Sequence, residues 1–83
     1  MNTVNILLLK ILAEKTYDKN IKEIQGALKS ININICERDI YQRLRRMKSQ
    51  HLIIAGWKGK IRVYAISDAG KFKLATFQEQ LRA

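Results

Sequence analysis

The sequence predicts a mainly α-helical domain with one small β-hairpin, in the order helix, helix, helix, strand, strand, helix. Apolar residues recur with helical spacing through the first fifty residues, change to a strand-like pattern after Gln50-His51, and return to helical spacing after Ser67. The chain has 83 residues, no proline and no low-complexity linker. We therefore expect residues 1–83 to form a single domain.

The first two helices follow from apolar spacing and one capping signal. The first helix is expected to begin near the N-terminus and to end near Lys15, with 16–18 as a short extended link. The second begins after Asn20, because Asn20 and Glu23 have the spacing of a capping box. The apolar stripes are Val4, Leu7, Leu8, Ile11 and Leu12 in the first helix, and Ile21, Ile24 and Leu28 in the second.

Residues 30–35 alternate polar and apolar side chains, a pattern that also fits a strand. We prefer a turn, because helical spacing resumes from Cys36 onward. Asn34 and Cys36 are alternative N-caps for this third helix. Its buried face is expected to hold Ile40, Leu44 and Met47.

A hairpin and a closing helix complete the chain. Residues 52–55 and 61–66 are rich in β-branched residues, and the two glycines in 56–60 predict a loop between them. Ser67 or Asp68 caps the last helix, whose shared face holds Gly70, Leu74, Phe77 and Leu81. Three helices followed by a two-stranded wing and a further helix form a winged helix-turn-helix.

The charge points to a polyanionic partner. The chain has 16 lysine and arginine residues against 7 acidic residues, a formal net charge of +9. Such an excess attracts nucleic acid or an anionic membrane surface, although a basic surface can also serve solubility alone. Between Glu37 and Arg62 there are eight basic and two acidic residues, so most of the excess lies on the third helix and the hairpin.

The third helix, around 36–50, carries the residues expected to read bases in a major groove. Arginine pairs with guanine and glutamine with adenine through two hydrogen bonds each. Arg43 and Lys48 lie nearer the buried side, where phosphate contact or simple solvation suits them better. A solvated surface helix is the alternative interpretation for the outer face. The face opposite the buried stripe holds Arg38, Gln42, Arg45 and Ser49, with Tyr41 and Arg46 on its flanks.

The hairpin tip, around 56–62, is expected to contact the DNA backbone. Lys58, Lys60 and Arg62 lie around a glycine, and such contacts position a protein without reading sequence. Trp57 could stack on a sugar or lie against the backbone; alternatively it folds back as a lid on the core.

These segments resemble a known family. Residues 40–47 followed by Leu52-Ile53 look like the recognition helix and first wing strand of PadR-like winged-helix regulators. Residues 62–71 are similar to that family's closing strand and helix start. The similarity covers nearly the whole chain, and MarR-type regulators are the nearest alternative. The resemblance implies a DNA-binding transcriptional regulator.

Three features of the sequence depart from the PadR pattern, two of them single residues and one of them a region. His51 replaces the glycine before the wing strand, and it would have to adopt the left-handed conformation. Cys36 stands where serine or threonine usually caps. The single helix after Ser67 replaces a long dimerising region, so the resemblance does not extend to that dimer architecture or to the family's small-molecule pocket.

Exposed apolar positions predict a homodimer. On the expected helices, Ile6, Leu9, Phe72 and Ala75 project away from the core stripes, and clustered exposed apolar residues usually mark an interface. The alternative is that Phe72 lies under the wing and Ile6 packs on the second helix.

The sequence offers no chemistry for an enzyme and no cofactor or metal site. One histidine, His51, and one cysteine, Cys36, form no catalytic or zinc-binding pattern. No apolar run is long enough to span a bilayer, and no signal peptide is recognisable, so we expect a cytoplasmic protein. The leading interpretation is a transcriptional regulator that binds double-stranded DNA and represses by occupying an operator. A winged-helix protein-interaction module or mobile-element control factor is the alternative.

Overall fold

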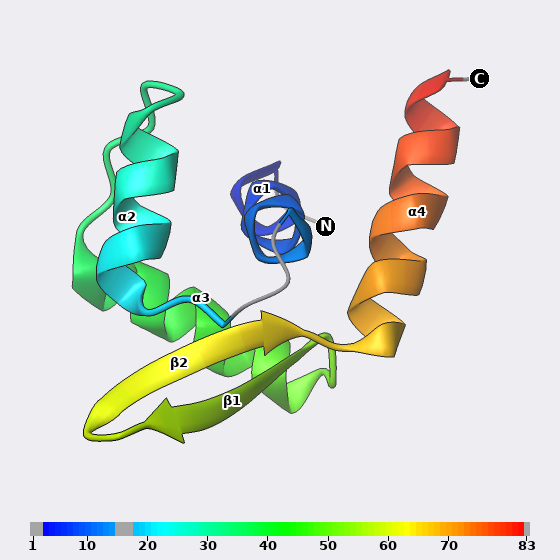
Figure 1. Ribbon diagram of the computed structural model, residues 1–83. Coiled ribbons are helices and arrows are strands. Elements are labelled where there is room, and N and C mark those ends of the chain that lie inside the picture. Colours follow the sequence, from blue (N-terminus) through cyan, green and yellow to red (C-terminus); the bar gives the residue numbers. More distant parts are fainter. Residues whose placement is uncertain (1–2, 15–17, 83) are drawn as a thin grey trace.

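The computed structural model describes residues 3–14 and 18–82, with side chains as far as residue 78. The order of elements confirms the predicted winged-helix arrangement (Figure 1). The elements are α1 (Thr3–Ala13), α2 (Ile21–Lys29), α3 (Glu37–Ser49), β1 (Ile53–Lys58), β2 (Ile61–Ile66) and α4 (Asp68–Arg82).

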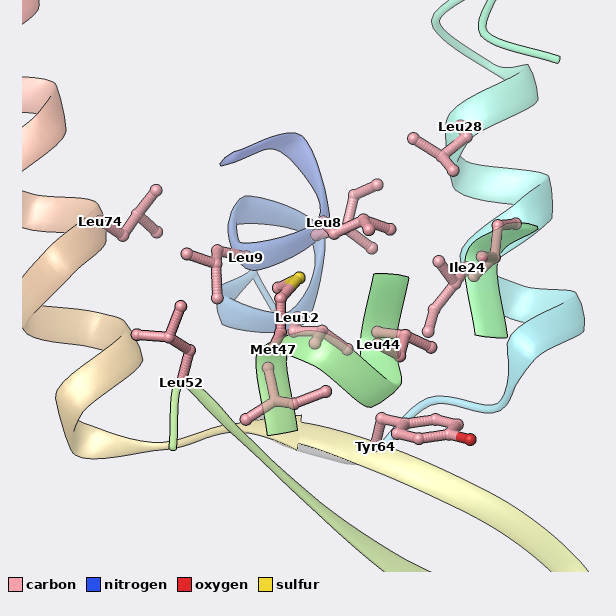
Figure 2. Close-up of a cluster of buried hydrophobic side chains, with 13 residues drawn as sticks. Leu8, Leu9, Leu12, Ile24, Leu28, Leu44, Met47, Leu52, Tyr64 and Leu74 are labelled. Carbon is pink, nitrogen blue, oxygen red and sulfur yellow. The ribbon is translucent and has the colours of Figure 1, made fainter. Parts of the chain in front are cut away.

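The core lies where α1 meets the other elements. In Figure 1, α1 is seen nearly end-on between α2 and α4, with α3 and the hairpin below it. α1 contacts α2, α4 and β2, and α3 packs on α2 and β1. Figure 2 shows the resulting cluster, in which mostly leucine side chains from the four helices converge with Leu52 and with Tyr64 of β2. The largest fully buried side chains are Leu8, Leu9, Ile24, Leu28, Ile40, Leu44, Met47 and Ile53.

One predicted exposed position is buried. We expected Leu9 to project from α1 toward a partner chain, but its side chain is 1% exposed and belongs to the core, so this prediction is wrong. The reason is that neighbours cover α1 on several sides, which widens its buried stripe beyond one helical face. Ile6 is half-buried and packs against the same core, whereas Phe72 on α4 is 75% exposed and does not lie under the wing.

The helix α2 begins at a capping box, whereas α3 begins without a side-chain cap. The capping box is present: Asn20 Oδ1 accepts from the Glu23 N–H at 2.9 Å, and the Asn20 N–H donates to Glu23 Oε1 at 3.1 Å. Residues 30–35 form the predicted turn rather than a strand, and Asn32 adopts a left-handed φ of 63°. α3 begins at Glu37, so Cys36 and not Asn34 is the N-cap. The Cys36 side chain makes no capping hydrogen bond.

The end of α3 is tied directly to the start of α4. His51 takes the left-handed conformation expected for it, with φ 62°. Its carbonyl accepts from the Ser67 hydroxyl at 2.6 Å, and Ser67 Oγ in turn accepts from the Gly70 N–H at 3.0 Å. Ser67, rather than Asp68, is therefore the side chain that caps α4.

The hairpin is longer and its turn tighter than predicted. We expected a loop over 56–60, but Gly56, Trp57 and Lys58 pair with Val63, Arg62 and Ile61 in antiparallel register. The turn is confined to two residues, 59 and 60, because Gly59 supplies a φ of 63° at no steric cost. The wing is therefore a stiff ribbon with a short tip.

A backbone bridge that the sequence did not predict fixes β2 to the start of α2. The Lys19 N–H donates to the Tyr64 carbonyl at 3.0 Å, and the Tyr64 N–H donates to the Lys19 carbonyl at 2.8 Å. The Lys19 side chain is buried, and its Nζ donates to the Ile11 carbonyl in the last turn of α1, where a positive charge is favourable. Of the expected extended link, residues 16 and 17 lie outside the described residues.

No helix in the described part of the chain combines the length and apolarity needed to cross a bilayer.

Candidate nucleic-acid interface

The outer face of α3 carries every residue predicted to read DNA. The inner face holds Ile40, Leu44 and Met47, all fully buried, so the opposite face points to solvent. A period of 3.6 residues then fixes which side chains lie outside. Arg38, Tyr41, Gln42, Arg45, Arg46 and Ser49 are all exposed.

Four of these residues lie together. Gln42, Arg45, Arg46 and Ser49 line one shallow, open depression over the middle and end of α3. Guanidinium and amide groups can form paired hydrogen bonds to guanine and adenine edges, so this surface carries donors of the kind that read a major groove. Arg38 is exposed near the start of the helix and is not part of this depression.

Arg43 has a different position from its neighbours on α3. It is half-buried, and its Nη1 donates to Asn5 Oδ1 of α1 at 3.1 Å. This agrees with the sequence interpretation that Arg43 lies nearer the buried side than the base-reading set. The contact ties α3 to α1 and helps to fix the direction of the helix.

The wing presents an aromatic ring and an arginine as a stacked pair. Trp57 is 67% exposed, so it is not a lid on the core. The Arg62 guanidinium carbon lies 5.0 Å from the centroid of the Trp57 ring, and the two residues are cross-strand partners. Directly opposed residues share a face of a hairpin, and the next pair on this face is Ala55 with the buried Tyr64. The Arg62–Trp57 pair therefore lies on the side of the wing that faces the protein.

The remaining predicted wing residues are the two lysines of the tip. Lys58 and Lys60 are both exposed and flank Gly59. Lys58 lies on the outer face of the ribbon, opposite Ile61, because faces alternate along a strand.

A small hollow separates α3 from β2. Its volume is about 150 Å³, and it is lined by Tyr41, Arg45, Lys48, Arg62 and Tyr64. None of these described lining residues is acidic. The sequence assigned Tyr41, Arg45 and Arg62 to DNA binding and gave Lys48 either phosphate contact or simple solvation, but it did not single out Tyr64. The alternation of β2 was the available signal, since Tyr64 shares a strand face with Arg62.

Tyr64 is a core residue whose polar end is at the edge of the core. Its side chain is 4% exposed and packs with the buried cluster, as Figure 2 shows. Burial raises the pKa of its phenol above the usual 10.0, while a hydrogen bond and charge from Arg62 act in the opposite direction. The hydroxyl is therefore protonated near neutral pH and can donate a hydrogen bond.

The described residues contain no cluster of three histidine, cysteine or acidic side chains that could hold a metal ion. Cys36 is a free, exposed thiol.

Comparison with known proteins gives matches in structure but none in sequence. No protein-family profile and no curated protein matches the chain. A PadR family transcription regulator from Clostridium difficile R20291 is similar at a TM-score of 0.88 and 24% identity, over 98% of this chain and 88% of that one. A PadR family regulator from Eggerthella lenta DSM 2243 has a TM-score of 0.84 and 24% identity, over 96% and 72%. Bacillus subtilis PadR, solved in complex with operator DNA, has a TM-score of 0.77 and 17% identity, over 94% and 48%. The chain therefore has the winged-helix fold seen in these transcription regulators.

Proposed function

We propose that this protein is a PadR-like transcriptional regulator that binds double-stranded DNA in a sequence-specific manner and represses by occupying an operator. The observation that carries the proposal is the outer face of α3, where Gln42, Arg45, Arg46 and Ser49 lie together and exposed. The complex of the structurally similar Bacillus subtilis PadR with operator DNA supports it. In this proposal the protein is a binding protein rather than an enzyme, and it acts in the cytoplasm.

The two parts of the surface have different roles. α3 enters the major groove, and Arg38, Gln42 and Arg45 contact base edges, because their side chains offer the required donors. The wing lies along the adjacent backbone, where Lys58 and Lys60 contact phosphates and supply affinity without sequence preference. Tyr41, Arg46 and Ser49 flank the reading set, and Trp57 and Arg62 form the inner side of the wing.

Selection from a random pool of DNA duplexes tests the proposal. Wild type should enrich one motif, and Arg45→Ala should enrich a motif relaxed at one base position. Lys73→Ala, an exposed basic residue on α4, serves as the matched control and should leave the motif unchanged. A pool that shows no enrichment with wild type contradicts sequence-specific binding.

We also propose that the regulator works as a homodimer. Phe72 and Ala75 are exposed on α4, and Ile6 is half-buried on α1, which packs beside α4. Pairing of these helices about a two-fold axis would leave both copies of α3 free for successive major grooves, about 34–36 Å apart. Sedimentation equilibrium should show a dimer for wild type and a monomer for Phe72→Glu. A wild type that stays monomeric at tens of micromolar, free and on DNA, contradicts this part.

The alternative function, a protein-interaction module, requires an apolar outer face on α3. The described outer residues of α3 are instead arginine, glutamine, serine and tyrosine, which favours DNA.

A further inference from the structure

The hollow between α3 and β2 has the composition of an anion site. Three cationic side chains reach it, Arg45 and Lys48 from α3 and Arg62 from β2. Two tyrosines, Tyr41 and Tyr64, complete the lining, and none of the described lining residues carries a negative charge. Three like charges around one small space repel one another, and an anion placed among them would relieve that repulsion.

Arg62 is held in position before any ligand arrives. Its guanidinium lies over the Trp57 ring at 5.0 Å, and its positive charge lies close enough to Tyr64 to act against the rise in that phenol's pKa. Its backbone is paired with β1 in a stiff ribbon with a two-residue turn. An arginine that is already ordered loses less conformational entropy on binding than a free surface arginine, so each hydrogen bond it makes contributes more to affinity.

Tyr64 adds a fixed neutral donor. Its ring is anchored among core side chains, so its hydroxyl cannot move far from the hollow. A protonated phenol and a guanidinium side by side are suited to the oxygens of a phosphate, because both donate and neither repels an anion.

The size of the hollow limits what it can hold. A volume of about 150 Å³ corresponds to about five water molecules. That space admits a single tetrahedral anionic group with a few waters, whereas it is too small for a base with its sugar. The hollow also adjoins the base-reading surface, because Arg45 lines both.

From this geometry we propose that the hollow binds one phosphate group of the DNA backbone, held jointly by the recognition helix and the wing. Lys48, Arg62 and the Tyr64 hydroxyl are its ligands, and of these three the sequence did not single out Tyr64 for contact with DNA. The inference rests on the proposed function. Its consequence is that one phosphate fixes the angle between α3 and the wing on the duplex.

The test replaces single phosphates of a selected duplex by neutral methylphosphonates, one position at a time. At one position in each half-site, wild type should lose about tenfold in affinity, the cost of one charge-assisted contact. Arg62→Gln should lose clearly less than tenfold at that position, because one of the three ligands of that phosphate is already gone. Lys60→Gln is the matched control, a wing cation outside the hollow, and its loss should add to that of the same methylphosphonate.

Tyr64→Phe and Lys48→Gln extend the same test. Tyr64→Phe removes only a hydroxyl, so it should weaken binding several-fold, leave the dependence on salt unchanged, and fail to add to the same methylphosphonate. Lys48→Gln alters an exposed residue and keeps the test open should Tyr64→Phe not fold. It should lower the slope of log affinity against log salt by about one unit.

A second arm distinguishes DNA phosphate from free phosphate. Inorganic phosphate is titrated against potassium chloride at equal ionic strength, with Trp57 fluorescence as the readout, since Arg62 lies over that ring. Saturable binding of inorganic phosphate, together with additive losses at every methylphosphonate, would overturn the DNA assignment in favour of a free anion. If the affinity losses of the variants add to those of every methylphosphonate and inorganic phosphate does not bind, the inference is overturned while DNA binding stays intact. If no duplex is selected at all, the proposed function itself fails, which is a separate result.

Discussion

A methyl group at Gly70 should strongly destabilise the protein, although alanine is normally the better helix former. Gly70 lies in the first turn of α4, where a Cβ atom would stand 2.0 Å from the Leu52 carbonyl oxygen and 2.8 Å from Ile66 Cγ1. The Leu52 oxygen also accepts a hydrogen bond from the Ser67 N–H at 3.1 Å, so it cannot retreat without losing that bond. The helix must therefore move away from the start of the wing.

The size of the effect follows from that displacement. Ordinary van der Waals contact begins near 3.4 Å, so α4 must move by about 1.4 Å relative to Leu52. Overpacking of this kind costs about 1–3 kcal/mol, to which a weakened backbone hydrogen bond adds about 1 kcal/mol. The higher helix propensity of alanine returns at most about 1 kcal/mol. The expected net loss for Gly70→Ala is about 2 kcal/mol, which in a domain of this size lowers Tm by roughly 10 °C.

Thermal unfolding followed by circular dichroism measures the change, with Gly26→Ala as the matched control. Gly26 lies exposed within α2, and a Cβ there would meet no atom within 4 Å. Gly26→Ala should therefore raise the free energy of unfolding by about 0.5–1 kcal/mol. The two glycine variants should thus change Tm in opposite directions. A Gly70→Ala protein as stable as wild type would refute the close packing of α4 on Leu52.

Three further predictions concern the interface. Arg38→Ala and Arg45→Ala should each cost about 1–3 kcal/mol of binding to a selected duplex and relax one base position, as measured by fluorescence anisotropy on single-base variants; unchanged affinity and preference in both would exclude base reading by α3. Replacing Lys58 and Lys60 with alanine should weaken all duplexes alike and flatten the log affinity against log salt slope by about one unit per lost contact; an intact slope would exclude backbone contact by the tip. The raised pKa of Tyr64 means that the folded state holds its phenolic proton more tightly than the unfolded state, so this group makes stability fall as pH rises above about 10. Tyr64→Phe should show a smaller fall in Tm between pH 9 and pH 11 than wild type, and an equal fall would contradict this.

The sequence predicted most of the helical fold because local signals agreed with tertiary packing. The capping box at Asn20 and the apolar stripe of α3 both act within one helix, so neither depends on what the helix meets. Burial of Leu9 could not be predicted in this way, because it depends on how many neighbours surround α1. Gly56 suggested a loop, but the turn was decided by the residue that adopts a positive φ, Gly59.

One part of the candidate interface could likewise be predicted from local sequence signals, and the other part could not. The outer face of α3 follows from a period of 3.6 residues once Ile40 is known to be buried, so a sequence is sufficient to list it. The hollow is different, because Lys48 and Tyr64 are brought together only by the angle at which the wing packs against α3. No local pattern encodes that angle.

The hydrogen bonds that join the end of α3 to the start of α4 through Ser67 bear on the length of DNA that the protein can recognise. The Ser67 hydroxyl donates to the His51 carbonyl and its oxygen accepts from the Gly70 N–H, so α3 ends and α4 begins at one rigid point. In a dimer paired through α4, the separation of the two recognition helices would then be built into each subunit rather than adjusted by a flexible hinge. Such a dimer would bind only those operators whose two half-sites have a matching separation. Inserting five base pairs between them, about half a helical turn, would rotate one half-site to the far side of the duplex, beyond the reach of the second recognition helix.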